Sequence, residues 1–191
     1  MSGTTKEFDG GLFQEGGSLV FFGIDQSYTG FAVTVLSETG AYYTWVYKSD
    51  KRGVDRLLDI EKFLQDLCID YGYRVKDISI EGPVRMSHAA LMSGELLAVV
   101  KMTLRKFFAR TDPGYPKQVP PSTLKKYTTG NGRADKKAMM AAVKENWGAE
   151  FRDDNAADSY ALAKIASKSA DNEVQAAILK QLEDVRFKDA L

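Results

Sequence analysis

The stretch Leu19-Val20-Phe21-Phe22-Gly23-Ile24-Asp25 decides the fold that the sequence predicts. It is a nearly continuous apolar run that ends in a carboxylate, which is typical of a strand covered on both faces of a sheet. Two more runs rich in β-branched and aromatic residues follow at 31–36 and 41–47, each after a short turn. Because short turns join antiparallel neighbours, these three strands are predicted to form a meander.

Beyond the meander, the pattern alternates between helix and strand. Apolar residues recur every three or four positions over 51–71, which predicts an amphipathic helix. Residues 77–81 predict a strand that again ends in an acid, Glu81. The remaining predicted elements are a helix over 88–108, an extended piece over 116–119, a helical turn from 120, and helices over 134–147 and 154–168.

This order of elements predicts an α/β fold. We expect a five-stranded mixed sheet, in which three antiparallel strands are followed by parallel crossovers, with helices on both faces. Residues 18–170 are expected to form this one domain. Residues 1–17 hold five glycines and show no period, so they are expected to be a flexible leader, and 171–191 are expected to be a polar helical tail.

The composition is that of a globular chain, with 44% hydrophobic and 27% charged residues among 191. No apolar run approaches the roughly 20 residues that a membrane span needs, and the N-terminus has no secretory pattern. A single cysteine, Cys68, excludes an internal disulfide and a thiolate zinc cluster. We therefore expect a protein of a reducing compartment, neither secreted nor embedded in a membrane.

The net charge of the whole chain is zero, but basic and acidic residues are concentrated in different segments. Residues 85–144 carry twelve Lys/Arg and three Asp/Glu, a net charge of +9, whereas 1–84 and 145–191 carry −5 and −4. A solvated helical face is one explanation of the basic middle segment. A surface for nucleic acid is the other, because polyanion binders concentrate positive charge in this way.

Acidic residues stand at three element ends. If the first and fourth strands are parallel neighbours, Asp25 and Glu81 emerge side by side at one edge of the sheet. On the last core helix, Asp154 and Asp158 are four residues apart and therefore roughly 40° apart around the axis. Asn155 can share a face with Asp158 as well. Taken singly, Asp25 is also typical of a turn residue and Asp154 of a helix N-cap.

Taken together, these carboxylates predict a metal site. Clustered acids repel one another unless a cation lies between them, and hard divalent cations prefer oxygen ligands, so Mg²⁺ is the expected ion and Mn²⁺ a substitute. Two such ions hold a scissile phosphate, one generating hydroxide and the other stabilising the departing oxygen. The chemistry that the pattern favours is phosphodiester hydrolysis.

Four segments carry a resemblance to a known family. They are Phe22-Gly23-Ile24-Asp25-Gln26-Ser27 with Thr29-Gly30; Ile78-Ser79-Ile80-Glu81-Gly82-Pro83; Val119 to Lys126 with Thr129-Gly130-Asn131-Gly132-Arg133-Ala134-Asp135-Lys136; and Asp154-Asn155-Ala156-Ala157-Asp158-Ser159-Tyr160-Ala161-Leu162-Ala163. In order and approximate spacing they resemble the RuvC-type Holliday-junction resolvases, which belong to the ribonuclease H-like nucleases. The resemblance covers about 19–167 and leaves out both tails.

The resemblance implies a ribonuclease H-like fold and a Mg²⁺-dependent, structure-selective endonuclease that resolves Holliday junctions and other branched DNA. It implies a homodimer with two active sites facing a four-way junction. It also implies that Asp25, Glu81 and Asp158 bind the metal and that Lys126 and Lys136 approach DNA phosphates near the cut. The full set of DNA-binding side chains expected from the basic segment is Arg85, Lys125, Lys126, Arg133, Lys136 and Lys137.

The sequence departs from the family pattern at two positions. The family's fourth acid often stands three residues before the last one, where this chain has Asn155, and the bacterial aromatic wedge is replaced by Val84. We expect Asp154 to serve as the fourth ligand, because an amide oxygen brings no charge. The divergence, small size and glycine-rich leader indicate a bacteriophage-like member, acting in the cytoplasm of a bacterial cell or a virus-infected host cell.

Three other functions compete with the resolvase hypothesis. The Gly23-Ile24-Asp25 motif also resembles the first phosphate loop of sugar-kinase and actin-like ATPases, but those need a duplicated domain for which 191 residues leave no room. A ribonuclease on RNA–DNA hybrids is the nearest enzymatic alternative. A catalytically inactive protein that binds branched DNA is the third, although carboxylates beside a phosphate ligand would not help it.

Overall fold

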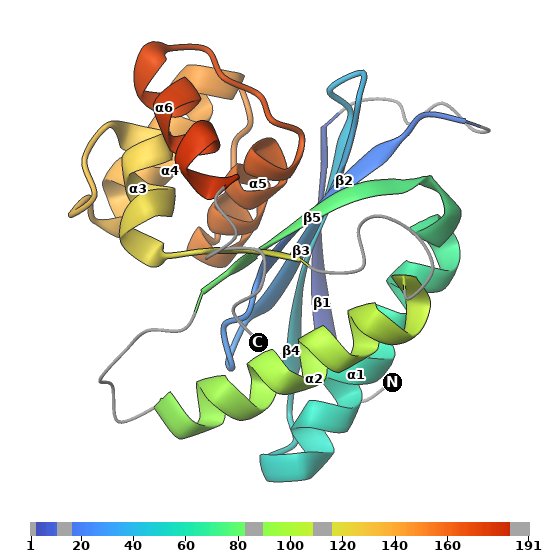
Figure 1. The fold of residues 1–191 in the computed structure, drawn as a ribbon. Coiled ribbons are helices and arrows are strands. Elements are labelled where there is room, and N and C mark those ends of the chain that lie inside the picture. The colour runs from blue at the N-terminus through green and yellow to red at the C-terminus, as the bar shows by residue number, and fades with distance from the viewer. Residues whose placement is uncertain (1–2, 11–16, 83–89, 109–115, 184–191) are drawn as a thin grey trace.

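The computed structural model describes residues 3–10, 17–82, 90–108 and 116–183. Its centre is a mixed sheet in the order β1-β4-β3-β2-β5-β6 (Figure 1). The strands are β1 (Gly3–Gly10), β2 (Val20–Asp25), β3 (Phe31–Ser37), β4 (Tyr42–Ser49), β5 (Val75–Glu81) and β6 (Lys117–Val119). The predicted meander is confirmed, since β2, β3 and β4 pair antiparallel in sequence order. Every residue of β2 and β3 is buried, as the unbroken apolar runs predict.

The sheet has six strands rather than the predicted five, because part of the leader joins it. Residues 3–10 form β1, which pairs antiparallel with β4 from Gly3↔Ser49 to Gly10↔Tyr42. The prediction of a flexible leader is therefore wrong for these residues. An edge strand such as β1 can be held by backbone hydrogen bonds to its neighbour without presenting an apolar face. The sequence of residues 3–10 therefore shows no alternating strand pattern. Phe8 is its main apolar contact, with its ring edge-on to Phe151 at 5.4 Å.

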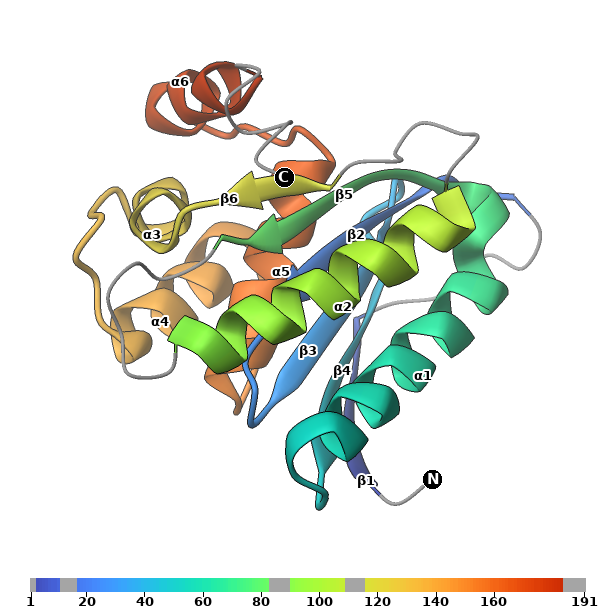
Figure 2. The ribbon, with the colours of Figure 1, turned by 60° about the horizontal axis from the view of Figure 1, so that its bottom comes forward.

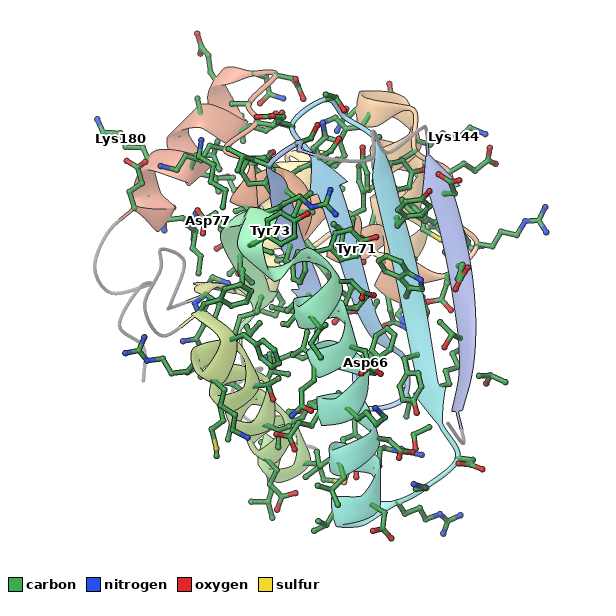
Figure 3. All side chains as sticks on the ribbon, turned by 90° about the vertical axis from the view of Figure 1, so that its right-hand side faces the viewer. Asp66, Tyr71, Tyr73, Asp77, Lys144 and Lys180 are labelled. Carbon is green, nitrogen blue, oxygen red and sulfur yellow. The ribbon has the colours of Figure 1, made fainter. Side chains whose placement is uncertain are left out.

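Helices cover both faces of the sheet, as predicted. On one face lie α1 (Gly53–Tyr71), followed by the 3₁₀ turn η1 (Gly72–Arg74), and α2 (Ala90–Phe108), side by side (Figures 1 and 2). Their apolar sides form one core with β2, β3 and β5. Tyr71 anchors the end of α1, its ring lying 6.3 Å from those of Phe22 and Trp45 (Figure 3).

The opposite face carries α5 (Asp154–Ala166), which packs on β2 and β3. Beyond it stand α3 (Pro121–Thr129), α4 (Lys136–Trp147) and α6 (Glu173–Leu182). The helices predicted over 51–71, 134–147 and 154–168 agree with α1, α4 and α5 within about two residues, whereas α3 is longer than the helical turn predicted from 120. Residue 88, the expected start of α2, lies outside the described residues. None of the helices in the described part of the chain is long and apolar enough to cross a bilayer.

Part of the predicted tail, residues 171–191, packs against the domain. It is helical as expected, but Ile178 and Leu182 of α6 are buried in one cluster with Leu124 and Tyr127 of α3. Their four-residue spacing places both on the same helix face, which is sufficient to dock a short helix. The packed domain therefore extends beyond residue 170 to at least 182.

Candidate active site

The ends of β2 and β5 place two acids together. These strands are parallel neighbours (Figure 2), with Ile24 opposite Ile80. Asp25 and Glu81 therefore emerge at the same edge, as the sequence predicted. Their side chains are hydrogen-bonded to each other. Two carboxyl groups can share a hydrogen bond only if one carries a proton, which agrees with the raised pKa of both groups.

Helix α5 brings further acids to the same edge because its backbone lies unusually close to β2. A Cβ atom at Gly23 would stand 2.0 Å from the carbonyl oxygen of Ser159 and 2.2 Å from the backbone nitrogen of Ala163. Only glycine permits this approach. Thr34 Oγ1 holds the helix from the neighbouring strand, 2.8 Å from Ser159 Oγ and 2.7 Å from Thr44 Oγ1. The packing therefore sets the height of Asp158 above the sheet.

The first turn of α5 separates the roles of three consecutive residues. Asp153 is the N-cap and accepts a hydrogen bond from the backbone N–H of Asn155 at 3.1 Å. It also lies 3.5 Å from Lys48 Nζ. The alternative that Asp154 caps the helix is therefore wrong, and its carboxylate instead forms an ion pair with Lys136.

The side chain of Asn155 is bonded to the N-cap residue of its own helix. Its Nδ2 donates to Asp153 Oδ1 at 3.1 Å, and the same atom would be 2.6 Å from a Cβ at Gly30. Asp154, by contrast, is close enough to both Asp25 and Asp158 to raise the pKa of each. The charges of Glu81, Asp154 and Asp158 thus all act on Asp25, and these four acids are hereafter called the carboxylate cluster.

Burial and mutual repulsion shift the carboxylate cluster toward its protonated form. Burial raises the pKa of Asp25 well above its ordinary range, and the charges of Glu81, Asp158 and Asp154 raise it further. Burial also raises the pKa of Glu81 to about 7, with Asp158 adding to the shift while the Asp25 hydrogen bond and Lys125 oppose it. For Asp158, burial and then Asp154 raise the pKa to about 6, against the charges of Lys125 and Lys136.

The donor set suits a hard divalent cation. The cluster offers only carboxylate oxygens, and Oδ1 of Asp158 is buried without a hydrogen-bond partner among the described residues. A positive charge between these acids would stabilise the ionised form of each carboxylate and offset their mutual repulsion. Within residues 3–10, 17–82, 90–108 and 116–183, no three Asp, Glu, His or Cys side chains already form a ligand set for one ion. The fit therefore rests on donor chemistry and electrostatics.

Basic side chains border the cluster from α3 and α4. Lys125 acts on the pKa values of both Glu81 and Asp158, and Lys136 acts on that of Asp158. Hydrogen bonding to Asp154 raises the pKa of Lys136. The Lys136 side chain is 78% exposed. The group hereafter called the basic rim comprises Lys125, Lys126, Arg133, Lys136 and Lys137, of which all but the half-buried Lys125 are exposed. Arg85 and Val84 lie outside the described residues.

Sequence reasoning missed two contributors to the site. One is Asp153, which caps α5; a run of two acids before an apolar helix left the cap undecided. The other is Gln26, whose side-chain amide donates to the carbonyl oxygen of Glu81 at 2.5 Å. A polar residue after a strand is typical of a turn, so nothing in the local pattern indicated this contact across 55 positions.

Comparisons with known proteins agree with this geometry at the level of the fold. Searches of the sequence against family models and curated proteins find no match. Among solved structures, RuvC of Thermus thermophilus matches with a TM-score of 0.59 and 18% identity, over 86% of this chain and 97% of RuvC. T. thermophilus RuvC in complex with a Holliday junction substrate matches with a TM-score of 0.60 and 18% identity, over 86% and 96%.

The chain has the RuvC-type ribonuclease H-like fold. This confirms the fold class that the motif resemblance implied. The two RuvC structures are too distant in sequence to transfer an activity, so catalysis has to be argued from the residues of this chain.

Proposed function

We propose that the chain is a Mg²⁺-dependent, structure-selective DNA endonuclease that resolves Holliday junctions and other branched DNA. The observation that carries the proposal is the carboxylate cluster: a buried Asp25 and the half-buried Glu81, Asp154 and Asp158 are gathered from β2, β5 and α5, at a cost in pKa that a structural role would not require. T. thermophilus RuvC, which shares this fold, has been solved in complex with a Holliday junction substrate, and this supports branched DNA as the substrate here.

The four acids of the carboxylate cluster are the proposed ligands of Mg²⁺, with Mn²⁺ as a substitute. Bound there, the metal would supply a nucleophilic hydroxide and neutralise charge on the scissile phosphodiester. Asp25 and Glu81 come from rigid strand ends and Asp158 from a helix locked to β2 through Gly23, so these donors are held in place before substrate arrives. Asp154, partly exposed, lies nearest to the solvent side.

The lysines that border the cluster have a complementary role. Lys136 is paired with Asp154 and highly exposed, so it can exchange that carboxylate for a DNA phosphate. Lys125 lies close enough to influence both Glu81 and Asp158, and it would hold a phosphate directly over the acids. The remaining members of the basic rim extend this positive surface outward from the cut site, which supports binding of the DNA backbone.

A homodimer is part of the proposal, since a four-way junction needs two symmetric cuts. Large apolar side chains are exposed along α2, namely Leu91, Met92, Met102 and Phe107. Exposed apolar surface of this kind is typical of a protein–protein interface. We expect wild-type chain to elute as a dimer in light-scattering chromatography and the Met102→Glu variant to shift toward monomer; a wild-type monomer at micromolar concentration would contradict the proposed assembly.

The bacteriophage-like origin and cytoplasmic site of action are also proposals. Their support is divergence: 18% identity to the RuvC structures and no match to a family model. The genes that flank the coding sequence test both, because phage replication or packaging genes are expected there.

The decisive experiment compares substrates. Purified protein is incubated with end-labelled four-way, three-way and linear DNA, and with an RNA–DNA hybrid, with and without Mg²⁺. We expect Mg²⁺-dependent cleavage of the branched substrates and little cleavage of linear duplex. Preferential cleavage of the hybrid would identify a ribonuclease, and binding of junctions without cleavage under any divalent ion would identify an inactive junction-binding protein.

A further inference from the structure

Gln26 occupies an unusual position beside the carboxylate cluster. It directly follows Asp25, is only 8% exposed, and donates from Nε2 to the carbonyl oxygen of Glu81 at 2.5 Å. The last paired residues of β2 and β5 are Ile24 and Ile80. The side chain of Gln26 thus links the two strands one residue beyond the point at which their backbone pairing ends.

The backbone around Glu81 is held from the other side as well. Glu81 is paired with Val119 of β6, and the N–H of Gly82 donates to the Val119 carbonyl oxygen at 2.7 Å. With the Gln26 bond on the β2 side, Glu81 is bracketed between two neighbouring strands. Without that bond, Glu81 would be tied only to the three-residue edge strand β6, and its separation from Asp25 would no longer be set.

The other end of the same amide is also informative. Oε1 of Gln26 is buried and has no hydrogen-bond partner among the described residues. Buried acceptors are almost always paired, so an unsatisfied one on the residue after Asp25 points to a donor beyond the described residues. The bond from Nε2 fixes the orientation of the amide, because the reverse orientation would bring two oxygens together.

We propose that Gln26 is a positioning residue of the carboxylate cluster: Nε2 sets the separation of Glu81 from Asp25, and Oε1 accepts a hydrogen bond from a water molecule that a bound divalent ion carries. This inference rests on the proposed metal-dependent function and extends it. Groups that hold metal ligands in place typically change metal affinity about 10- to 100-fold when they are removed. Gln26 acts through Glu81 and is not itself a ligand.

The test measures ion binding without DNA or catalysis. Mn²⁺ is titrated by calorimetry into wild-type protein and into the Gln26→Met and Gln26→Asn variants. Methionine keeps the volume but removes the hydrogen bonds, and asparagine keeps the amide but shortens its reach. The matched control is Gln175→Met in α6, because Gln175 is also buried, its Oε1 accepts from the Asp171 N–H at 2.6 Å, and its Nε2 has no partner among the described residues.

We expect both Gln26 variants to bind Mn²⁺ about 10-fold more weakly than wild type, while Gln175→Met binds it normally. Thermal melting without metal separates positioning from general stability, since Gln26→Met and Gln175→Met should lower the melting temperature to a similar extent. Wild-type affinity in both Gln26 variants overturns the role of Gln26 and leaves the metal site standing. Failure of the wild-type chain to bind Mn²⁺ overturns the metal site and this inference together.

Discussion

The carboxylate cluster and the nearby lysines of the basic rim, Lys125 and Lys136, differ in their exposure to solvent. Asp25 is 3% exposed, whereas the Lys136 side chain is 78% exposed. Burying like charges is costly and shifts their pKa values, while lysines in water cost little and contribute little to stability. This difference is what we expect if the proposed function is right, with the acids holding a cation and the lysines making reversible contact with a polyanion. Substitutions in the two groups should therefore have different effects.

The largest effect is expected from removing an acid at the strand ends. Asp25→Asn and Glu81→Gln should each lower the rate of junction cleavage by about 1,000-fold or more, equivalent to about 4 kcal/mol in the barrier. Repulsion within the cluster is relieved at the same time, so metal-free variants should melt at equal or higher temperature and still bind DNA. Cleavage near the wild-type rate at matched Mg²⁺ would place the active site elsewhere.

A smaller loss is expected at the start of α5, where the fourth ligand is decided. Asp154→Asn should reduce cleavage by about 100-fold, because a charge is removed from the cluster while the Asp153 cap is untouched. Asn155→Ala should change it by less than about 5-fold, since its amide bonds Asp153 instead. Single-turnover rates on a labelled junction measure both. The reverse pattern would mean that Asn155 fills the position of the family's fourth acid.

A fourfold alanine variant of the basic rim should weaken DNA binding more than it slows the cleavage step. Replacing Lys125, Lys126, Arg133 and Lys136 by alanine should weaken junction binding at least about 10-fold and lower the salt slope by about 0.9 for each phosphate that the protein no longer neutralises. Gel-shift titrations over a range of salt measure the slope. Lys62→Ala, at an exposed lysine of α1, is the control and should leave the slope unchanged. An unchanged slope in the fourfold variant would move the DNA off the basic rim.

The smallest effect concerns stability and pH. The pKa of Glu81 is raised from 4.5 to about 7 and that of Asp158 from 3.8 to about 6, so the folded state binds more protons than the unfolded state in this window. Stability from these groups is complete below about pH 4 and is lost as pH rises through 6 to 7. Metal-free protein should therefore melt about 5 °C lower at pH 7.5 than at pH 5, roughly 2 kcal/mol for this size.

The control for this prediction is the Glu81→Gln variant, in which the fall in melting temperature should be smaller. Saturating Mg²⁺ should stabilise the wild type more at pH 7.5 than at pH 5, because the ion competes with protons for the same oxygens. A melting temperature that rises over this range in metal-free protein, with no difference in Glu81→Gln, would contradict the buried, like-charged cluster.

Much of the architecture was predictable because it follows from local pattern. Unbroken apolar runs predicted β2 and β3, and the three- and four-residue spacing predicted α1. The edge strand β1 escaped prediction because its stability comes from hydrogen bonds to β4, which leave no trace in hydropathy. The docking of α6 escaped too, since Ile178 and Leu182 are a short apolar signal in a polar stretch whose significance depends on α3.

The sequence by itself determined that acids stand at the ends of two strands and one helix, and that positive charge is concentrated between two acidic segments. Tertiary structure decided which of them meet. Parallel pairing of β2 with β5 joins Asp25 to Glu81, and the glycine contact at Gly23 seats α5 so that Asp154 faces the cluster while Asn155 turns to Asp153. The physical reason is range: periodicity and capping act over a few residues, whereas the contacts that bring the strand ends and α5 together join positions from 55 to more than 100 residues apart.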